Sequence, residues 1–308
     1  MILYNLLILS SLTLGQVWPS DIVTIKGIGG DHAHSILRAW GVLYAGKRVP
    51  FKKVLLNYYS TDTRAAEVTI SQDQLTHHFA ISGRRYLYPR LRDTENFLSF
   101  PLVAGPVVIV YNLPGIELML DMLTLSGIYS GQISNWADSA LELRSNQSLP
   151  NATIQVVTLH GRTGQTEALT TAFAESVPNW ADRYGQFAQS EELHENRSRG
   201  WEPGFVRFFA DGAVGVAGVV RSVRHTIGYV DLANAVRYDM QIASLYNQRG
   251  RLFDEGEILT AMHCSLHNKL LDILELNGNL EQFSFESFPG DCPRNFSYPL
   301  AVIETVIL

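Results

Sequence analysis

Basic clusters, long apolar stretches and cysteines are scarce in this sequence of 308 residues. The net charge is −6 and the 24 Lys and Arg residues form no block, which argues against nucleic acid or an anionic membrane as a partner. After the first 16 residues, no segment reaches the ~20 consecutive apolar residues of a membrane-spanning helix. The composition, 46% hydrophobic and 18% charged, is typical of a globular protein with a substantial core and room for two domains.

Catalytic signatures are missing as well. There is no G-x-S-x-G motif, and neither of the two cysteines belongs to a recognisable Cys–His catalytic motif. Residues 161–166, GRTGQT, are similar to a phosphate-binding loop but lack its G-K-[ST] core. We therefore predict that the protein is not an enzyme and uses no cofactor.

A metal site is the alternative suggested by the histidines. Asp31, His32 and His34 carry atoms that bind metals, and His77 and His78 form a further pair. Side chains two positions apart on a helix diverge, however, so they seldom share one ion. We predict no metal site.

The N-terminus and the sequons favour export. Residues 1–15 form an apolar run that ends in small residues, as a signal peptide does, although Lys and Arg are absent from its start. The alternative is a buried first strand. Asn-X-Ser/Thr triplets, candidate glycosylation sites, occur at Asn146, Asn151, Asn196 and Asn295. These features predict a secreted or extracellular protein, or a periplasmic one if the source is bacterial.

The two cysteines, Cys264 and Cys292, fall late in the chain. In a secreted protein, a lone pair most simply forms one disulfide, which limits the freedom of the unfolded chain by roughly 3 kcal/mol. The alternative is two inert buried thiols. The sequence ends in an apolar strand-like segment, from which we expect a fragment or a piece of a longer chain.

Strand-like and helix-like segments alternate, which predicts an α/β fold. The segment 34–46 should be a helix with Ile36, Leu37, Trp40 and Leu43 on one apolar face. We expect strands at 21–27, 52–60, 101–112, 152–161 and 297–308, helices at 118–131 and 165–175, and a strand-to-helix unit at 225–237. The polar segment 176–204 is interpreted as a surface loop.

Several segments resemble one family in their order along the chain. They are GIGGDHAHSILRAW, FPLVAGPVVIVYNLPG, LTLSGIYSGQISNWAD, VVTLHGRTGQTEALTTAF, DGAVGVAGVVRSVRHTIGYVDLANA and SYPLAVIETVIL. The series resembles the phosphate-binding proteins of bacterial phosphate ABC transporters, the PstS-like group of periplasmic binding proteins. The most specific piece is LSGIYSGQISNWAD, and the resemblance extends from about residue 22 to residue 308.

The resemblance implies a class II periplasmic-binding-protein fold, with two α/β lobes and a ligand cleft between them. Residues 22–106 and 235–308 would form lobe 1, and residues 107–234 would form lobe 2. Helix N-termini carry unpaired N–H groups and a partial positive charge, so several of them facing one cleft bind an oxyanion.

The family's ligand residues are only partly present here. Of two ligand positions in the first loop, Asp31 replaces a Thr and His32 an aromatic residue, while Thr63 preserves a hydroxyl in the second loop. The Asp that accepts the proton of hydrogen phosphate falls at Gly83, and the Arg falls at Leu159. The Ser-Gly-Thr positions are taken by Thr163, Gly164 and Gln165.

Two interpretations of this partial match stay open. In the first, Arg84 or Arg162 replaces the lost Arg and Asp31 the lost Asp, so that the candidate ligand-binding residues are Asp31, His32, Thr63, Gly83, Arg84, Arg162, Thr163, Gly164 and Gln165. In the second, the arginines are solvated and Asp31 only caps its own helix, where its charge opposes an anion.

The sequence thus predicts an extracellular, monomeric solute-binding domain that captures phosphate or another small oxyanion. The alternative is a domain of the same fold without a ligand, serving as the ectodomain of a receptor, adhesion or matrix protein in a membrane-tethered or multidomain setting.

Overall fold

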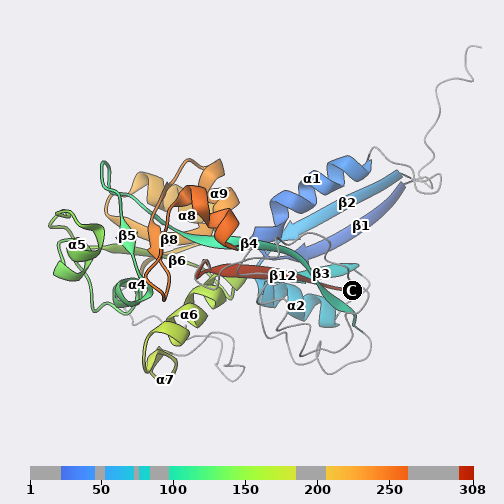
Figure 1. The fold of residues 1–308 in the computed structure, drawn as a ribbon. Helices are drawn as coiled ribbons and strands as arrows, with labels where there is room; N and C mark the ends of the chain where they lie inside the picture. Colours follow the sequence, from blue (N-terminus) through green and yellow to red (C-terminus); the bar gives the residue numbers. More distant parts are fainter. Residues whose placement is uncertain (1–21, 46–52, 73–75, 84–96, 185–205, 263–297) are drawn as a thin grey trace, which may run out of the picture.

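The computed structural model describes residues 22–45, 53–72, 76–83, 97–184, 206–262 and 298–308, which form an α/β structure with two lobes (Figure 1). Cys264, Cys292, Asn196, Asn295, Arg84 and residues 1–15 lie outside these ranges. In the described ranges, no helix is long and apolar enough to cross a membrane.

The first lobe contains the N-terminal strands and helices, at one end of the molecule in Figure 1. Its elements are β1 (Ile22–Gly29), a 3-10 turn (Asp31–Ala33), α1 (His34–Ala45), β2 (Lys53–Ser60), α2 (Thr63–Gln72) and β3 (Phe79–Ser82). Strand β1 pairs in parallel with both β2 and β3. The turns that follow β1 and β2 therefore lie at the same edge of the sheet, where each leads into a helix.

Two long strands join the first lobe to the rest of the molecule. Strands β4 (Ser99–Tyr111) and β12 (Ala301–Ile307) are antiparallel partners and run through the middle of the ribbon in Figure 1. Strand β12 also pairs with β3, whereas the C-terminal half of β4 pairs with β8. One sheet thus continues through both lobes, in the order β2-β1-β3-β12-β4-β8-β6-β7.

The second lobe follows β4 in the chain. Its larger sheet is formed by β6 (Gln155–Leu159), β7 (Val206–Ala210), β8 (Thr226–Asp231) and β9 (Gln241–Ile242), and its helices are α4 (Met122–Tyr129), α5 (Ser139–Ser145), α6 (Gly164–Ser176), α7 (Trp180–Tyr184), α8 (Gly212–Ser222) and α9 (Leu232–Arg237). A small sheet combines β5 (Met119–Leu120), β10 (Ser244–Tyr246) and β11 (Leu252–Phe253).

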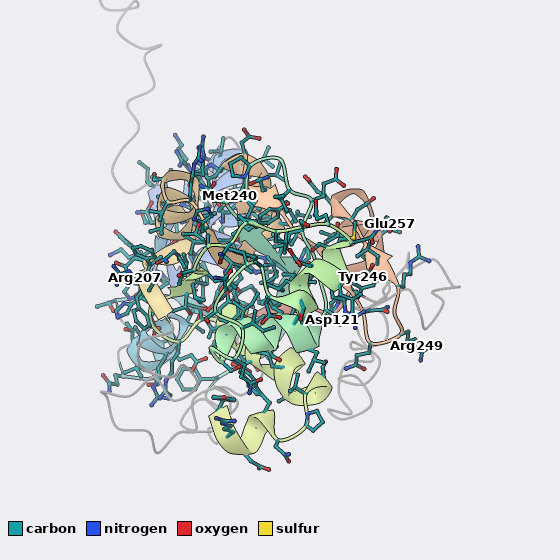
Figure 2. The ribbon with its side chains drawn as sticks, turned by 90° about the vertical axis from the view of Figure 1, so that its left-hand side faces the viewer. Asp121, Arg207, Met240, Tyr246, Arg249 and Glu257 are labelled. Atoms are coloured by element: carbon teal, nitrogen blue, oxygen red, sulfur yellow. The ribbon has the colours of Figure 1, made fainter. Side chains whose placement is uncertain are left out.

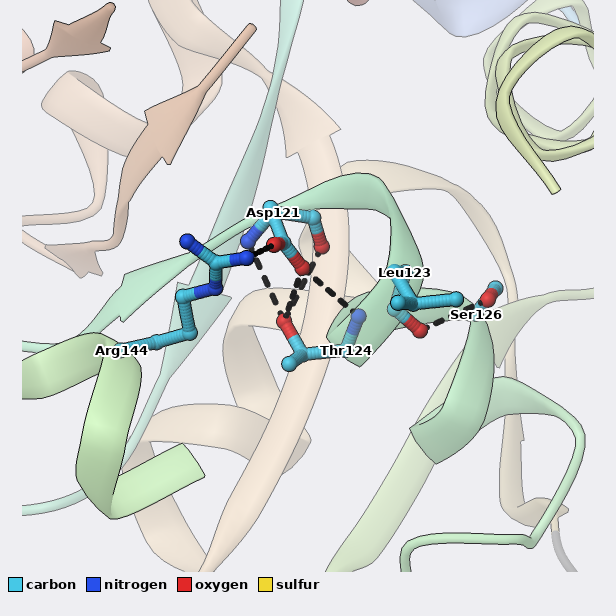
Figure 3. A network of polar contacts seen from close by, with 5 residues as sticks. All are labelled: Asp121, Leu123, Thr124, Ser126 and Arg144. Carbon is cyan, nitrogen blue, oxygen red and sulfur yellow. Dashed lines mark hydrogen bonds and ion pairs between the residues drawn. The ribbon is translucent and has the colours of Figure 1, made fainter. Parts of the chain in front are cut away.

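Helix α4 begins with a capping box that ties it to α5 and to the small sheet (Figures 2 and 3). The Asp121 carboxylate accepts a hydrogen bond from the Thr124 N–H at 2.8 Å and pairs with Arg144 of α5 at 2.6 Å. The Arg144 guanidinium also lies 5.7 Å from the centre of the Tyr246 ring. An N-terminal cap of this kind stabilises a short helix whose first N–H groups have no intrahelical partner.

The largest core belongs to the second lobe. It includes Trp136, Tyr129, Phe173 and Tyr229, all inaccessible to solvent, and the indole of Trp136 donates to the His225 carbonyl at 3.1 Å. Two smaller clusters lie in the first lobe, around Leu37 and Ile81 and around Ala66 and Ile70.

Three local expectations need correction. Leu43 is two-thirds exposed, because the buried stripe of α1 is carried by Leu37 with partial burial of Ile36 and Trp40. Residues 119–120 form a strand, since Asp121 caps and thereby starts the helix expected from residue 118. The segment interpreted as a surface loop contains α7, whose Trp180 is buried against Phe173.

Residues 240–261 contribute to the core of the second lobe. Met240, Leu245, Phe253 and Ile258 are buried in the same cluster as β6 and β8, whereas β12 returns to the first lobe. We therefore propose that the second lobe extends to about residue 262, beyond the boundary expected at residue 234.

Candidate functional site

The carboxylate of Asp31 links the loop after β1 in the first lobe to the start of α8 in the second lobe. Asp31 follows β1 and does not cap its own helix, whose N-cap is Gly30 with no side-chain hydrogen bond. Its Oδ2 instead accepts the N–H of Ala213, in the first turn of α8 in the second lobe, at 3.1 Å. Gly212, with φ of 62°, precedes this contact, and a Cβ there would lie 3.2 Å from the carboxylate. Asp31 therefore acts as a cap for a helix in the other lobe.

Asp62 makes a second contact of the same kind. It follows β2, and its Oδ1 accepts the Ala65 N–H at 2.8 Å, which caps α2. Its Oδ2 accepts the N–H of Arg162, in the loop before α6. Gly161, with φ of 77°, lies so close to this carboxylate that a side chain would clash. Thus two carboxylates of the first lobe each bind a backbone N–H near a helix start of the second lobe.

Glu304 of β12 is the most deeply buried carboxylate at this junction. Its side chain is 1% exposed, and the Nδ1 atom of His32 lies 3.3 Å from its Oε1. Its other oxygen, Oε2, is buried and has no hydrogen-bond partner among the described residues. A charge in such surroundings is costly unless it is paired, so His32 is its main compensation within the described structure.

His32 is held between Glu304 and β4. Its side chain is only 7% exposed, and its Nε2 packs so closely on Gly105 that no side chain fits at that position. Burial by itself lowers the pKa of His32, but the carboxylate of Glu304, with Asp231 and Asp31 farther away, raises the pKa above its usual value. The carboxylate of Glu304 therefore favours the protonated form of His32.

Gly30 and Gly83 lie beside the Glu304 carboxylate, and Thr63 lies beside Gly30. A Cβ placed on Gly30 would lie 3.2 Å from the Thr63 hydroxyl and 3.7 Å from Glu304 Oε1. A Cβ placed on Gly83 would lie only 2.8 Å from the same Oε1. Glu304 thus fills the space that a side chain at position 83 would need, and Gly83 is where the family resemblance calls for a carboxylate.

The start of α6, in the second lobe, packs against Gly83 of the first lobe. A Cβ on Gly164 would lie 2.6 Å from the Gly83 carbonyl, so the two backbones are in direct contact. Thr163 is the N-cap of α6: its hydroxyl accepts the Thr166 N–H at 3.2 Å. Gln165 follows and is 5% exposed. The structure therefore brings Thr163 and Gly164 to the same junction as Gly83, with Gln165 next in the first turn.

Of the two arginines proposed to replace the family's Arg, the structure describes Arg162 but not Arg84. Leu159, at the position of the family's Arg, is buried in the core of the second lobe. The backbone N–H of Arg162 binds Asp62, which places this loop at the junction. His160 is exposed, with its Nδ1 3.2 Å from the Asp211 carboxylate. Within the described ranges, no group of three metal-ligating side chains is present.

Sequence reasoning missed Glu304 and Asp62. Glu304 is the one acid in the segment 298–308, and it occupies a buried position of β12 two residues from each of the buried residues Val302 and Val306. An acid at the core-facing position of a β-strand is a detectable signal, because a buried charge needs a structural or functional partner. The sequence around Asp62 predicts only that it caps α2. Its contact with the second lobe could not be predicted, because Arg162 lies 100 positions away in the chain.

Comparison with known proteins identifies the family. A family model described as PBP superfamily domain matches residues 19–280. The chain belongs to the PBP superfamily. It is 29% identical to the phosphate-binding protein PstS of Haemophilus influenzae, an alignment that spans 84% of this chain and 74% of the relative. It is also 29% identical to PstS of Pasteurella multocida, over 74% of this chain and 62% of that relative.

A solved structure of this PBP type has the same fold. A high-affinity periplasmic phosphate-binding protein, PfluDING, solved bound with phosphate, superposes with a TM-score of 0.59 at 16% identity, over 92% of this chain and 80% of the other. The expected two-lobed fold is thereby confirmed. In this PBP domain, the starts of α6 and α8 lie where the two lobes meet, and the carboxylates of Asp31 and Asp62 bind backbone N–H groups there.

Proposed function

We propose that this domain captures a small oxyanion, with phosphate as the first choice, between its two lobes. Membership of the PBP superfamily and the PstS relatives support this proposal. The starts of α6 and α8 point toward the first lobe, and backbone N–H groups at such starts are suited to anions. Binding is non-covalent and couples to closure of the lobes about β4 and β12.

The observation that carries the proposal is the position of Glu304. Its Oε1 lies where a side chain at Gly83 would extend, so Glu304 supplies from β12 the carboxylate that position 83 lacks. An ionised carboxylate accepts a hydrogen bond from an oxyanion that retains a proton and repels one that has none. We therefore propose that the site prefers hydrogen phosphate to sulfate, which carries no proton at neutral pH.

His32 completes this arrangement. Its Nδ1 faces Glu304 Oε1, so a protonated ring offsets the carboxylate charge while Oε2 is left without a partner in the described structure. A ligand O–H directed at Oε2 would satisfy that buried acceptor, which favours a protonated ligand.

Isothermal titration with phosphate and with sulfate tests the proposal. We expect the wild-type protein to bind phosphate more tightly than sulfate. The variant Glu304→Gln, which keeps the shape but replaces an acceptor oxygen by a donor, should lose most of that preference. Asp239→Asn is a matched control, because it removes one negative charge from an exposed turn of the second lobe.

Absence of heat with either anion at millimolar concentration contradicts an oxyanion-binding function and favours the ligand-free ectodomain. An unchanged preference in Glu304→Gln contradicts the role of Glu304 while leaving anion binding intact.

We further propose that the domain is a secreted monomer and carries glycans. Asn146 and Asn151 are both exposed at the surface of the second lobe, as glycan acceptors must be. The signal peptide and the Cys264–Cys292 disulfide remain part of the same proposal. Peptide mapping of the secreted protein tests it, and unmodified Asn146 and Asn151 would contradict glycosylation at these positions.

A further inference from the structure

The lobes are joined at their junction by carboxylates of the protein itself. Asp31 Oδ2 accepts the Ala213 N–H at 3.1 Å, and Asp62 Oδ2 accepts the Arg162 N–H. Both acceptors belong to the first lobe and both donors to the second. The two contacts involve different loops, so each is an independent observation of the same arrangement.

These N–H groups are of the type that an oxyanion would use. Ala213 is the second residue of α8, which has 11 residues and whose first N–H groups lack intrahelical partners. Arg162 directly precedes Thr163, the N-cap of the 13-residue helix α6. Asp211, the N-cap residue of α8, makes no side-chain cap hydrogen bond. Asp31 therefore supplies the cap that α8 does not receive from its own chain segment.

Geometry favours both contacts. Gly212 and Gly161 have φ of 62° and 77°, conformations that glycine adopts at low cost, and side chains there would crowd the two carboxylates. Asp62 is fixed further because its other oxygen caps α2. The carboxylates thus meet the second lobe in a defined arrangement whenever the lobes close.

We propose that Asp31 and Asp62 act as internal ligands that link the lobes and compete with an incoming oxyanion for these N–H groups. This inference rests on the proposed function, because it concerns the regulation of the same site. Hydrogen bonds to an ionised acceptor are roughly twice as strong as neutral ones, and a tethered carboxylate competes at a high effective concentration. The two residues therefore raise the oxyanion concentration that is needed to occupy these N–H groups.

The variants Asp31→Asn, Asp62→Asn and the double variant test this inference. Asn removes the charge but retains a side-chain oxygen that can cap α2, so folding should be preserved. Near-ultraviolet circular dichroism and the thermal midpoint verify the fold, and Asp239→Asn again controls for the change in net charge.

Hydrogen exchange measured by mass spectrometry gives a readout that needs no anion. In the wild-type protein the Ala213 and Arg162 amides should be protected. Asp31→Asn should reduce protection at Ala213, Asp62→Asn at Arg162, and the double variant at both. Unchanged protection in the double variant would overturn the inference.

Phosphate titration provides the second readout. Loss of both internal competitors should tighten phosphate binding by about tenfold, which corresponds to weakening the competing contacts by about 1.4 kcal/mol. If the wild-type protein binds phosphate and the double variant binds it no more tightly, the competition is refuted and the proposed function stands. If no variant binds any anion while protection is lost as expected, the lobe contact is supported and the oxyanion function fails.

Discussion

At the scale of single residues, the buried pair of His32 and Glu304 distinguishes this site. The Glu304 carboxylate is 1% exposed, so its charge needs a nearby positive group. The ring of His32 lies 3.3 Å away and provides it. At position 32 the family resemblance places an uncharged aromatic residue. The change at position 32 and the buried acid on β12 are therefore complementary. Together they add a buried histidine–carboxylate pair to the junction, where the carboxylates of Asp31 and Asp62 also lie.

This pair predicts that stability depends on pH. Because folding raises the pKa of His32, the stability it contributes is fully present below its unfolded pKa of about 6.5 and is lost as pH rises through the folded pKa. His32→Gln, which cannot titrate, should remove that loss. Urea unfolding between pH 5.5 and 8.5 measures it, with the exposed His160→Gln as the control.

A free energy of unfolding that falls equally with pH in wild type and His32→Gln would show that other groups cause the dependence. The same fall in His160→Gln and wild type is expected in either case.

The family resemblance predicted ligand roles for Thr63, Gly83, Thr163 and Gly164, and these roles stay predictions. Each of these residues follows a strand or starts a helix at the sheet edge facing the other lobe. The role of Asp31 was not predictable from local sequence. Its partner, Ala213, is 182 positions away, and only the tertiary arrangement brings the two together.

At the scale of secondary structure, strands and helices with strong apolar patterns were predicted best. The buried segment of β4 and the strand-to-helix unit β8–α9 appear where expected, since β-branched runs and cap residues are local signals. Short elements such as β5 and α7 were missed, because tertiary packing and the cap at Asp121 determine them.

The cap of α4 predicts a measurable loss of stability. Asp121→Ala removes the acceptor of the Thr124 N–H and the ion pair with Arg144, and should cost about 1 kcal/mol. Asp121→Asn keeps a capping oxygen and loses only the ion pair, which is partly exposed and worth ~0–1 kcal/mol. Urea unfolding of both variants separates the two contributions.

If Asp121→Asn destabilises the protein as much as Asp121→Ala, the ion pair and not the cap stabilises α4. This outcome would contradict the importance given to the capping box in Figure 3.

At the scale of the whole molecule, one sheet runs through both lobes. Strands β4 and β12 connect the lobes (Figure 1), and β12 carries Glu304. A bound anion beside Glu304 would therefore contact the connection itself as well as the helix starts on either side. This placement couples ligand binding to the relative position of the lobes.

The two-lobed architecture was predictable because the family's segments recur in order along the chain. The contacts between the lobes were not, since Asp31 and Asp62 bind backbone N–H groups of loops that are distant in sequence. The extent that we propose for the second lobe rests likewise on the packing of Met240, Leu245 and Phe253, which no local pattern assigns to a lobe.

A crystal structure of the protein grown in saturating phosphate is the most direct test of oxyanion capture between the lobes. We predict a tetrahedral anion beside Glu304, in contact with Thr63 and the start of α6, with the Asp31 and Asp62 carboxylates displaced from the Ala213 and Arg162 amides. The proposal would be contradicted by a structure at saturating phosphate in which no anion lies between the lobes and both carboxylates still accept hydrogen bonds from the Ala213 and Arg162 amides.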